Sequence, residues 1–225
     1  MDQLSANSKR NGWDRLKNEG IPRLLSDLLN PLLVPPIVLG LMAWLLGGST
    51  STVSWISAGA AIFYTLIPLA STMHLLRTDQ ITTLDLPSRQ SRHKLFLISI
   101  GSATLATGIF WLLISPINQL IVVVSLVFLV NMIVGYLINR SWKISIHAAG
   151  LASAGAIFLF LSQLTFLETL TGVHILSLTI LLLLLPLVIW ARYQLNVHSL
   201  AELFGGALTG FLLTIIELSI LTSLW

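Results

Sequence analysis

The chain has 225 residues, of which 55% are apolar and only 9% are charged. A water-soluble domain of this length usually carries about 25% charged residues, so this composition excludes an ordinary soluble protein. There is no cysteine, which excludes disulfides and cysteine-based metal or redox sites. The formal charge of +3 is no sign of a nucleic-acid partner, because the basic residues follow the membrane topology described below.

The first 28 residues carry five basic and four acidic side chains and have no apolar core of signal-peptide type. We expect residues 1–28 to be a retained cytoplasmic segment, followed by a single membrane domain over 29–225. An apolar stripe at i, i+3, i+4, i+7 and i+8 begins near Pro22 and predicts an amphipathic helix at the membrane interface; it comprises Ile21, Leu24, Leu25, Leu28 and Leu29. The alternative is that the stripe opens the first span, with a kink at Asn30-Pro31.

Seven stretches approach the roughly 20 apolar residues that a membrane-spanning helix needs. They lie near 31–48, 53–75, 95–115, 118–138, 146–164, 172–190 and 199–223. Turn-forming residues that lack lysine and arginine separate three pairs of them: Gly47-Gly48-Ser49, Ser115-Pro116 and Thr171-Gly172. The sequence therefore predicts an all-α integral membrane bundle of about seven transmembrane helices, or six if the hairpin over 95–138 is misjudged.

With seven spans, the N-terminus and the loops at 76–94, 139–145 and 191–198 share one side of the membrane. All twelve basic residues fall on that side: Lys9, Arg10, Arg15, Lys17, Arg23, Arg77, Arg89, Arg92, Lys94, Arg140, Lys143 and Arg192. Cytoplasmic loops retain lysine and arginine, which places this side in the cytoplasm and the C-terminus opposite. We expect a multi-pass protein of a prokaryotic plasma membrane.

The same side collects the polar residues that could perform chemistry, in three clusters. The clusters are Asp79, Asp85, Arg89, Arg92, His93 and Lys94; Lys143, Ser145 and His147; and Arg192, His198 and Glu202. His198 and Glu202 are spaced i, i+4, so on a helix they share a face, and the carboxylate can orient the imidazole. Arginines near histidines suit a phosphate, because guanidinium groups match its oxygens, and a second histidine can protonate a leaving alkoxide.

The third cluster, Arg192, five residues, His198, three residues and Glu202, resembles a signature of the type 2 phosphatidic acid phosphatase family. That signature reads Ser-Arg, five residues, His, three residues, Asp. The segment Ile-Ser145-Ile-His147 is similar to the second family signature, Pro-Ser-Gly-His. Asp85, six residues and Arg92-His93 align with the first, Lys, six residues, Arg-Pro. Order and side agree over residues 85–202.

The resemblance implies a metal-independent membrane phosphatase that acts on an amphiphilic lipid phosphate or diphosphate. His198 would attack phosphorus to form a phosphohistidine, Glu202 would orient His198, and His147 would protonate the leaving oxygen. Four side chains would hold the phosphate oxygens: Arg92, Arg192, Ser145 and Lys143. No metal or cofactor is expected. The bilayer and the lipid substrate are the expected partners.

Several positions depart from the family signatures. Asp85 replaces a lysine and reverses a charge beside the expected phosphate, and we expect Lys143 or Lys94 to supply the missing cation. Glu202 replaces aspartate with a longer arm. The remaining departures are His93 for proline, Ile144 and Ile146 for proline and glycine, and Ala191 for serine.

Other interpretations stay open at this point. The charged face could collect an anion for a small transporter or channel, or the chain could be a catalytically inactive member of the family. Asp79 and Asp85 could instead hold Mg²⁺ in a prenyl-transferring enzyme. Ser145 could simply cap a helix, and His198 with Glu202 could be a polar pair at a helix start. Glu217 is expected to extend to the far membrane face.

Overall fold

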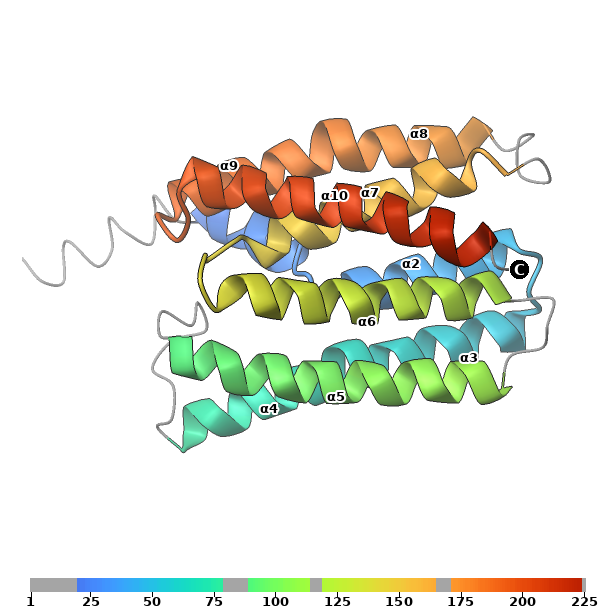
Figure 1. The fold of residues 1–225 in the computed structure, drawn as a ribbon, viewed down its shortest axis with the longest axis horizontal. Helices are drawn as coiled ribbons and strands as arrows, with labels where there is room; N and C mark the ends of the chain where they lie inside the picture. The colour runs from blue at the N-terminus through green and yellow to red at the C-terminus, as the bar shows by residue number, and fades with distance from the viewer. Residues whose placement is uncertain (1–19, 79–88, 114–118, 165–170, 224–225) are drawn as a thin grey trace, which may run out of the picture.

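The computed structural model describes residues 20–78, 89–113, 119–164 and 171–223, and helix is the only regular secondary structure in these ranges. Residues 20–28 form a first helical segment. The elements that follow are α2 (Val34–Leu45), α3 (Thr50–Ala60), η1 (Ala61–Leu66), α4 (Ile67–Arg77), α5 (Arg89–Leu113), α6 (Gln119–Asn139), α7 (Ile146–Leu161), α8 (Thr171–Thr179), η4 (Ile180–Leu184), α9 (Leu185–Gln194) and α10 (Leu200–Ser223). They run back and forth along the long axis of one bundle (Figure 1).

Five helices in the described ranges are long and apolar enough to cross a membrane: Thr50–Arg77, His93–Leu113, Gln119–Asn139, Gly172–Gln194 and Leu200–Ser223. Their outward surfaces carry large apolar side chains, and Trp111, Leu112 and Leu182 are 69%, 77% and 72% exposed. Lipid solvates such a surface, whereas water does not. The prediction of an all-α membrane bundle is therefore confirmed. Helices α2 and α7, with 12 and 16 residues, are apolar but shorter.

Two of the long helices contain a proline, and each passes through it by way of a π-helical segment. Proline lacks an N–H and its ring collides with the carbonyl four residues earlier, which normally kinks a helix. Here η1 precedes Pro68 and η4 precedes Pro186, and the N–H groups of Ile67 and Leu185 reach back five residues to Ile62 and Ile180. The wider turns absorb the proline, so each predicted span remains one continuous helix.

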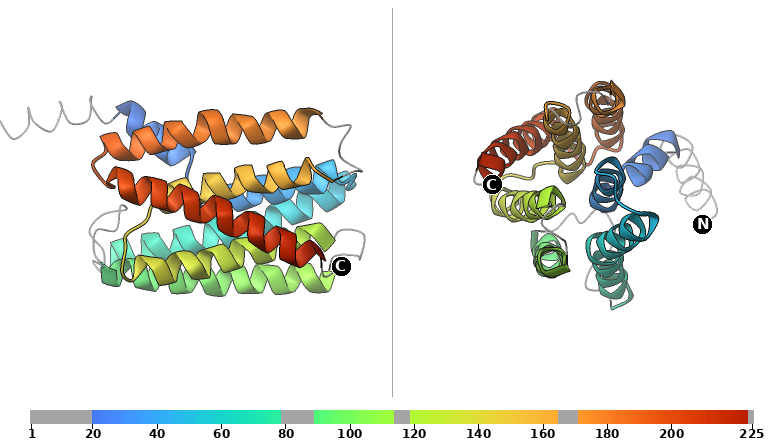
Figure 2. Two further views of the ribbon diagram at one scale, coloured as in Figure 1. Left: turned by 45° about the horizontal axis from the view of Figure 1, so that its top comes forward. Right: turned by 90° about the vertical axis from the view of Figure 1, so that its right-hand side faces the viewer.

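Helix α7 lies between α10 and α8 and packs most closely against α10 (Figure 2). Its small residues are buried, and glycines on α10 lie against its backbone. A Cβ added to Gly206 would collide with the carbonyl oxygen of Ser145, and one added to Gly210 would collide with that of Ala149. Small residues let two backbones approach in this way.

The close contact of α7 and α10 brings their first turns together at one end of the bundle. The backbone N–H of Ser145, just before α7, donates to the carbonyl of Glu202 in α10 at 3.0 Å. The ends of α4, α6 and α9 and the start of α5 lie at the same end, near residues 20–28 (Figure 1). The second and third polar clusters of the sequence therefore meet.

Residues 20–28 lie beside this end as a helix distinct from α2. The side chain of Asn30 accepts the backbone N–H of Leu32 at 3.0 Å, and a turn over residues 31–33 precedes α2. Ile21, Leu24 and Leu28 are exposed, whereas Ser26 on the other face is buried. The short helix therefore presents an apolar face outward and a small polar face to the bundle.

Candidate functional site

Five ionisable side chains gather where the connectors before α7 and α10 meet. We call Lys143, His147, Arg192, His198 and Glu202 the histidine cluster. Arg192 lies in the last turn of α9 and Lys143 just before α7. His198 lies just before α10, and His147 and Glu202 lie in the first turns of α7 and α10. Helix packing thus collects residues that are up to 59 positions apart in the sequence.

A capping box sets the position of Glu202. The hydroxyl of Ser199 accepts the backbone N–H of Glu202 at 3.3 Å, and Oε2 of Glu202 accepts the backbone N–H of Ser199 at 2.9 Å. This reciprocal pair satisfies two N–H groups that a helix start leaves unpaired. The pattern Ser199-Leu-Ala-Glu202 is a recognised sequence signal from which this cap could have been predicted.

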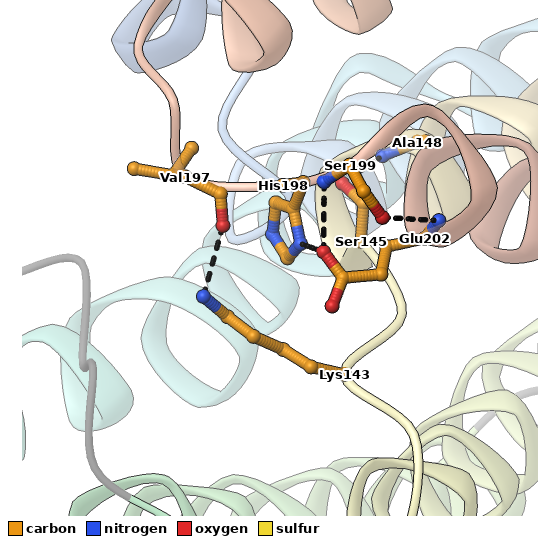
Figure 3. A network of polar contacts seen from close by, with 7 residues as sticks. All are labelled: Lys143, Ser145, Ala148, Val197, His198, Ser199 and Glu202. Atoms are coloured by element: carbon orange, nitrogen blue, oxygen red, sulfur yellow. Dashed lines mark hydrogen bonds and ion pairs between the residues drawn. The ribbon is translucent and has the colours of Figure 1, made fainter.

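The same carboxylate also faces His198. Nδ1 of His198 lies 3.4 Å from Oε2 of Glu202, and the other ring nitrogen points away from the carboxylate (Figure 3). At this distance a proton on Nδ1 makes a long contact with the carboxylate rather than an ideal hydrogen bond. A proton on Nδ1 would leave the lone pair of Nε2 free. Glu202 therefore favours the tautomer that a nucleophilic imidazole requires.

The imidazole of His198 is only 6% exposed. Burial lowers the pKa of His198 to about 4, and the positive charges of Arg192 and Lys143 act in the same direction, whereas Glu202 opposes them. A histidine with this pKa is neutral at neutral pH. Its ring nitrogen is therefore available as a base or nucleophile throughout the physiological range.

Lys143 reaches across the junction between the two connectors. Its Nζ donates to the carbonyl of Val197 at 2.9 Å (Figure 3), and its charge acts on both His198 and Glu202. Lys143 thus places a positive charge beside His198.

Arg192 is buried, and a residue of the short helix over 20–28 forms a hydrogen bond with it. Nη1 of Arg192 donates to the hydroxyl of Ser26 at 3.0 Å, and Ser26 is 1% exposed. The positive charge of Arg192 acts on both candidate catalytic histidines, His147 and His198. Sequence reasoning missed Ser26, because nothing in residues 20–28 indicates a contact with a residue 166 positions away.

His147 lies on the inner side of the same cluster. The charges of His198 and Arg192 both act on it, and the backbone of Ser26 is a hydrogen-bond partner of its ring. Its Nδ1 is buried and has no hydrogen-bond partner among the described residues. The structure therefore brings the histidines of the second and third clusters close enough for each to be affected by the charge of Arg192.

Ser145 has a structural role in this arrangement. It is fully buried, and its hydroxyl accepts the backbone N–H of Ala148 at 3.4 Å as the N-cap of α7. Its own N–H is the one that holds the connector to Glu202. The helix-cap alternative is therefore observed, and the expected contact of the Ser145 hydroxyl with a phosphate would require its exposure.

The first predicted cluster is described only in part. Asp79 and Asp85 lie outside the described residues, as does the side chain of Arg92, whose backbone begins α5. Lys94 is exposed, and Nδ1 of His93 forms a hydrogen bond of 2.6 Å with the hydroxyl of Tyr136.

Helix α5 packs mainly against α4, η1 and α6, whereas α7, α9 and α10 pack against one another. The start of α5 shares the end of the bundle that carries the histidine cluster (Figure 1), but α6 separates α5 from α7 and α10 (Figure 2). The described helices thus bring the second and third clusters together, whereas α5, which carries part of the first, packs against other helices.

Glu217 differs from the expectation that it extends to the far membrane face. It is 9% exposed, on the buried face of α10, and both carboxylate oxygens are buried without a hydrogen-bond partner in the described part of the chain. The position of Glu217 along α10 does not determine on which side of the helix its side chain lies. The residue faces the interior of the bundle because it follows Gly210 and Thr214 on the face of α10 that packs against α7.

The histidine cluster combines a neutral imidazole, an adjacent carboxylate and two cationic side chains at the end of a membrane bundle. This combination can bind an oxyanion and supply a nucleophile or a base. Comparison with known proteins does not assign a family: no protein-family model, no curated protein and no solved structure matches the chain.

Proposed function

We propose that the chain is a membrane-embedded phosphatase that hydrolyses a lipid phosphate or diphosphate at the cytoplasmic face. The observation that carries the proposal is the position of His198, with Nδ1 3.4 Å from Glu202 and with the charges of Lys143 and Arg192 acting on it. A carboxylate behind an imidazole and cations around it are the groups that in-line attack on phosphorus needs. The resemblance of the three clusters to the type 2 phosphatidic acid phosphatase signatures supports the same reaction.

In the proposed reaction, Nε2 of His198 attacks phosphorus and the bond to the lipid oxygen breaks. His147, which must enter the reaction as the imidazolium, donates its proton to the leaving alkoxide, and Lys143 and Arg192 neutralise the non-bridging oxygens. Water then attacks the phosphohistidine, His147 accepts its proton, and inorganic phosphate leaves. Arg92 joins the phosphate ligands in this proposal, from the first turn of α5.

The proposed topology has seven passes, with α2 and α7 as the two short ones. It places the N-terminus and the histidine cluster in the cytoplasm and the C-terminus on the opposite side. The twelve-to-zero distribution of lysine and arginine supports this orientation. A site at a helix end near the membrane surface favours an amphiphilic substrate, whose headgroup reaches the cations while its tail stays in lipid.

Phosphate release from a panel of lipid phosphates and diphosphates by the purified protein tests the proposal. Activity is expected with and without EDTA, and it is expected to be lost in His198→Ala. In sealed inverted membrane vesicles a water-soluble short-chain substrate reaches the cytoplasmic face directly, so these vesicles should be more active than right-side-out ones. Absence of phosphate release from every substrate would contradict the proposal.

A transporter is the second candidate function, and polar residues inside the bundle favour it. The amide of Asn131 donates to Thr214 at 2.8 Å, and Ser153 and Thr214 share a hydrogen bond of 2.8 Å. A second polar group joins η1, α5 and α6: Tyr64 and Thr107 each bond to the hydroxyl of Ser125 at 2.9 Å. Uptake of a labelled anion into proteoliposomes, without its hydrolysis, would favour transport over phosphatase activity.

A further inference from the structure

Glu217 has no function in the proposed phosphatase reaction, and its position is chemically unusual. It belongs to a helix long and apolar enough to cross a membrane, and both of its oxygens are buried without a hydrogen-bond partner in the described ranges. An ionised carboxylate in an apolar interior carries a large desolvation penalty unless a partner offsets it. Ionisable residues at such positions by default indicate a functional site.

The register of α10 against α7 identifies what surrounds Glu217. Gly210 lies against Ala149, and four residues later Thr214 bonds to Ser153 at 2.8 Å. Equal steps on both helices show that they run in parallel, so Glu217 lies one turn further, at the level of residues 156–157 of α7. Both of those α7 residues are buried and apolar.

Helix α6 runs in the opposite direction and gives the same result. Asn131 donates to Thr214 at 2.8 Å, so the next turn of α10 lies at the level of Val127 and Phe128, which are buried. The polar side chains that bond on the α10 side of this register are those of Asn131, Ser153 and Thr214, one turn closer to the histidine cluster, whereas Ser125 of α6 bonds to Tyr64 and Thr107. The α6 and α7 side chains at the level of Glu217 are apolar, and the nearby hydroxyl of Ser177 in α8 donates to the carbonyl of Gly155.

The charged and titratable groups on the neighbouring helices lie at the other end. Helices α6, α7 and α9 pack against α10, and the titratable residues on them are Tyr136, His147, Arg192 and Tyr193. All of these lie in the helix turns nearest the histidine cluster. Glu217 is 15 residues beyond Glu202, which is about 22 Å along the helix. No cation on these helices lies at the level of its carboxylate.

We propose that Glu217 is a proton-binding site, held as a neutral carboxylic acid between α6, α7 and α10. The proton fits better than a metal ion, because a metal ion needs several oxygen ligands and the register places apolar side chains at this level. Only six residues of α10 follow Glu217, about 9 Å along the helix. The site therefore exchanges its proton with the membrane face opposite the histidine cluster.

A hydrophobic carbodiimide tests the protonation state directly. The O–H of a protonated carboxyl adds across a C=N bond of the reagent, its proton moves to nitrogen, and the product rearranges to a stable N-acylurea. The full chain in detergent or nanodiscs would be treated with dicyclohexylcarbodiimide at neutral pH and mapped by peptide mass spectrometry. We expect the adduct at Glu217, its loss in Glu217→Gln, and its retention in the matched variant Glu202→Gln.

Further outcomes decide between a proton and a metal ion. Alkaline pH should suppress labelling of Glu217, whereas added Na⁺ at constant pH should leave it unchanged. Protection by Na⁺ would overturn the proposal in favour of a cation site, and absence of an adduct at Glu217 would overturn it altogether. If Glu217→Gln fails to fold, the peptide map and pH dependence of the unaltered chain give the answer alone. The outcome does not depend on whether the chain is a phosphatase.

Discussion

The hydroxyl of Ser26 accepts a hydrogen bond of 3.0 Å from the guanidinium of Arg192, and this contact joins the short N-terminal helix to the histidine cluster. The backbone of Ser26 is also a hydrogen-bond partner of His147. The opposite face of the same helix exposes Ile21, Leu24 and Leu28. If these side chains lie in the membrane interface, membrane binding of the helix also holds Ser26 against Arg192.

Ser26→Ala should therefore lower phosphatase activity without unfolding the bundle. Hydrogen bonds to charged groups contribute about 1.5–3 kcal/mol, so a loss of roughly 10- to 100-fold in kcat/KM is expected if the bond matters fully in the transition state. Ser141→Ala is the matched control, because Ser141 is an exposed serine at the same end of the bundle whose hydroxyl, among the described residues, bonds to the nearby carbonyl of Ile138. Equal activity of the two variants would contradict a positioning role for Ser26.

Glu202 has two functions in the structure, and two variants separate them. Glu202→Gln keeps a side-chain oxygen for the N–H of Ser199, because glutamine also forms a capping box, but it removes the negative charge beside His198. It should lower kcat by about 10²–10⁴-fold with little change in thermal stability. Ser199→Ala should do the reverse, with a loss of about 0.5–2 kcal/mol in stability and activity retained by the folded protein.

Thermal unfolding in detergent and phosphate release, measured on the same preparations, check both variants. Full activity in Glu202→Gln would show that the carboxylate only caps α10. Such a result would leave His198 without an orienting group and would count against the proposed mechanism.

The pH dependence follows from the pKa of His198, which burial and the nearby cations lower to about 4. The neutral imidazole is the reactive form, so the acid limb of the kcat/KM profile due to His198 should lie near pH 4 rather than near its ordinary value of about 6.5. Lys143→Met removes one of the cations and should move this limb to higher pH. Arg77→Met, which changes an exposed basic residue at the end of α4, is the control.

The same shift has a consequence for folding. A histidine whose pKa is lower in the folded state than in the unfolded chain binds fewer protons when folded. Its contribution to stability is therefore complete above about pH 6.5 and is lost as the pH falls toward about 4. Lys143→Met should reduce this acid destabilisation. Unfolding midpoints at several pH values would contradict the assignment if they did not change across this interval in the unaltered chain.

How much of the site could be predicted depended on sequence distance. His198 and Glu202 could be paired from their i, i+4 spacing alone. The meeting of the second and third clusters followed from the even number of predicted spans between them. The bond between Ser26 and Arg192 could not be predicted, because periodicity describes one helix and carries no information about which distant helix it contacts.

For the fold as well, the sequence predicted single helices better than the contacts between them. Apolar length predicted the helices to within a few residues, and even the two prolines did not interrupt them, because π-helical turns absorb proline in a way that length cannot reveal. For Glu217 the 1.5 Å rise gave the depth, but its burial depends on the rotation of α10, which the contacts of Gly206 and Gly210 with α7 determine.

Those contacts can be tested by adding one methyl group. Gly206→Ala should destabilise the bundle and displace the connector before α7, because its Cβ would collide with the carbonyl oxygen of Ser145. Overpacking of this kind costs about 1–3 kcal/mol. Gly135→Ala on α6 is the matched control: its Cβ would meet nothing within 4 Å, so the variant should be neutral or slightly stabilising. Thermal unfolding in detergent distinguishes the two, and equal midpoints would contradict the close packing of α7 and α10.

The last prediction concerns Asp85, the position where the chain departs most from the phosphatase signatures. Asp85 lies outside the described residues, so its role rests on the sequence. If Asp85 is a simple departure and Lys143 supplies the cation, Asp85→Lys should leave activity unchanged or raise it, since it adds a positive charge beside the expected phosphate. Asp79→Lys is a nearby charge control.

EDTA and vanadate complete this experiment. Activity that needs no metal should survive EDTA, and vanadate should inhibit it, because vanadate adopts the five-coordinate geometry of the transition state. If Asp85→Lys and EDTA both abolish activity, Asp85 binds a metal ion that the reaction requires. The phosphohistidine mechanism would then be wrong for this chain, and a metal-dependent reaction on the aspartates of residues 79–85 would replace it.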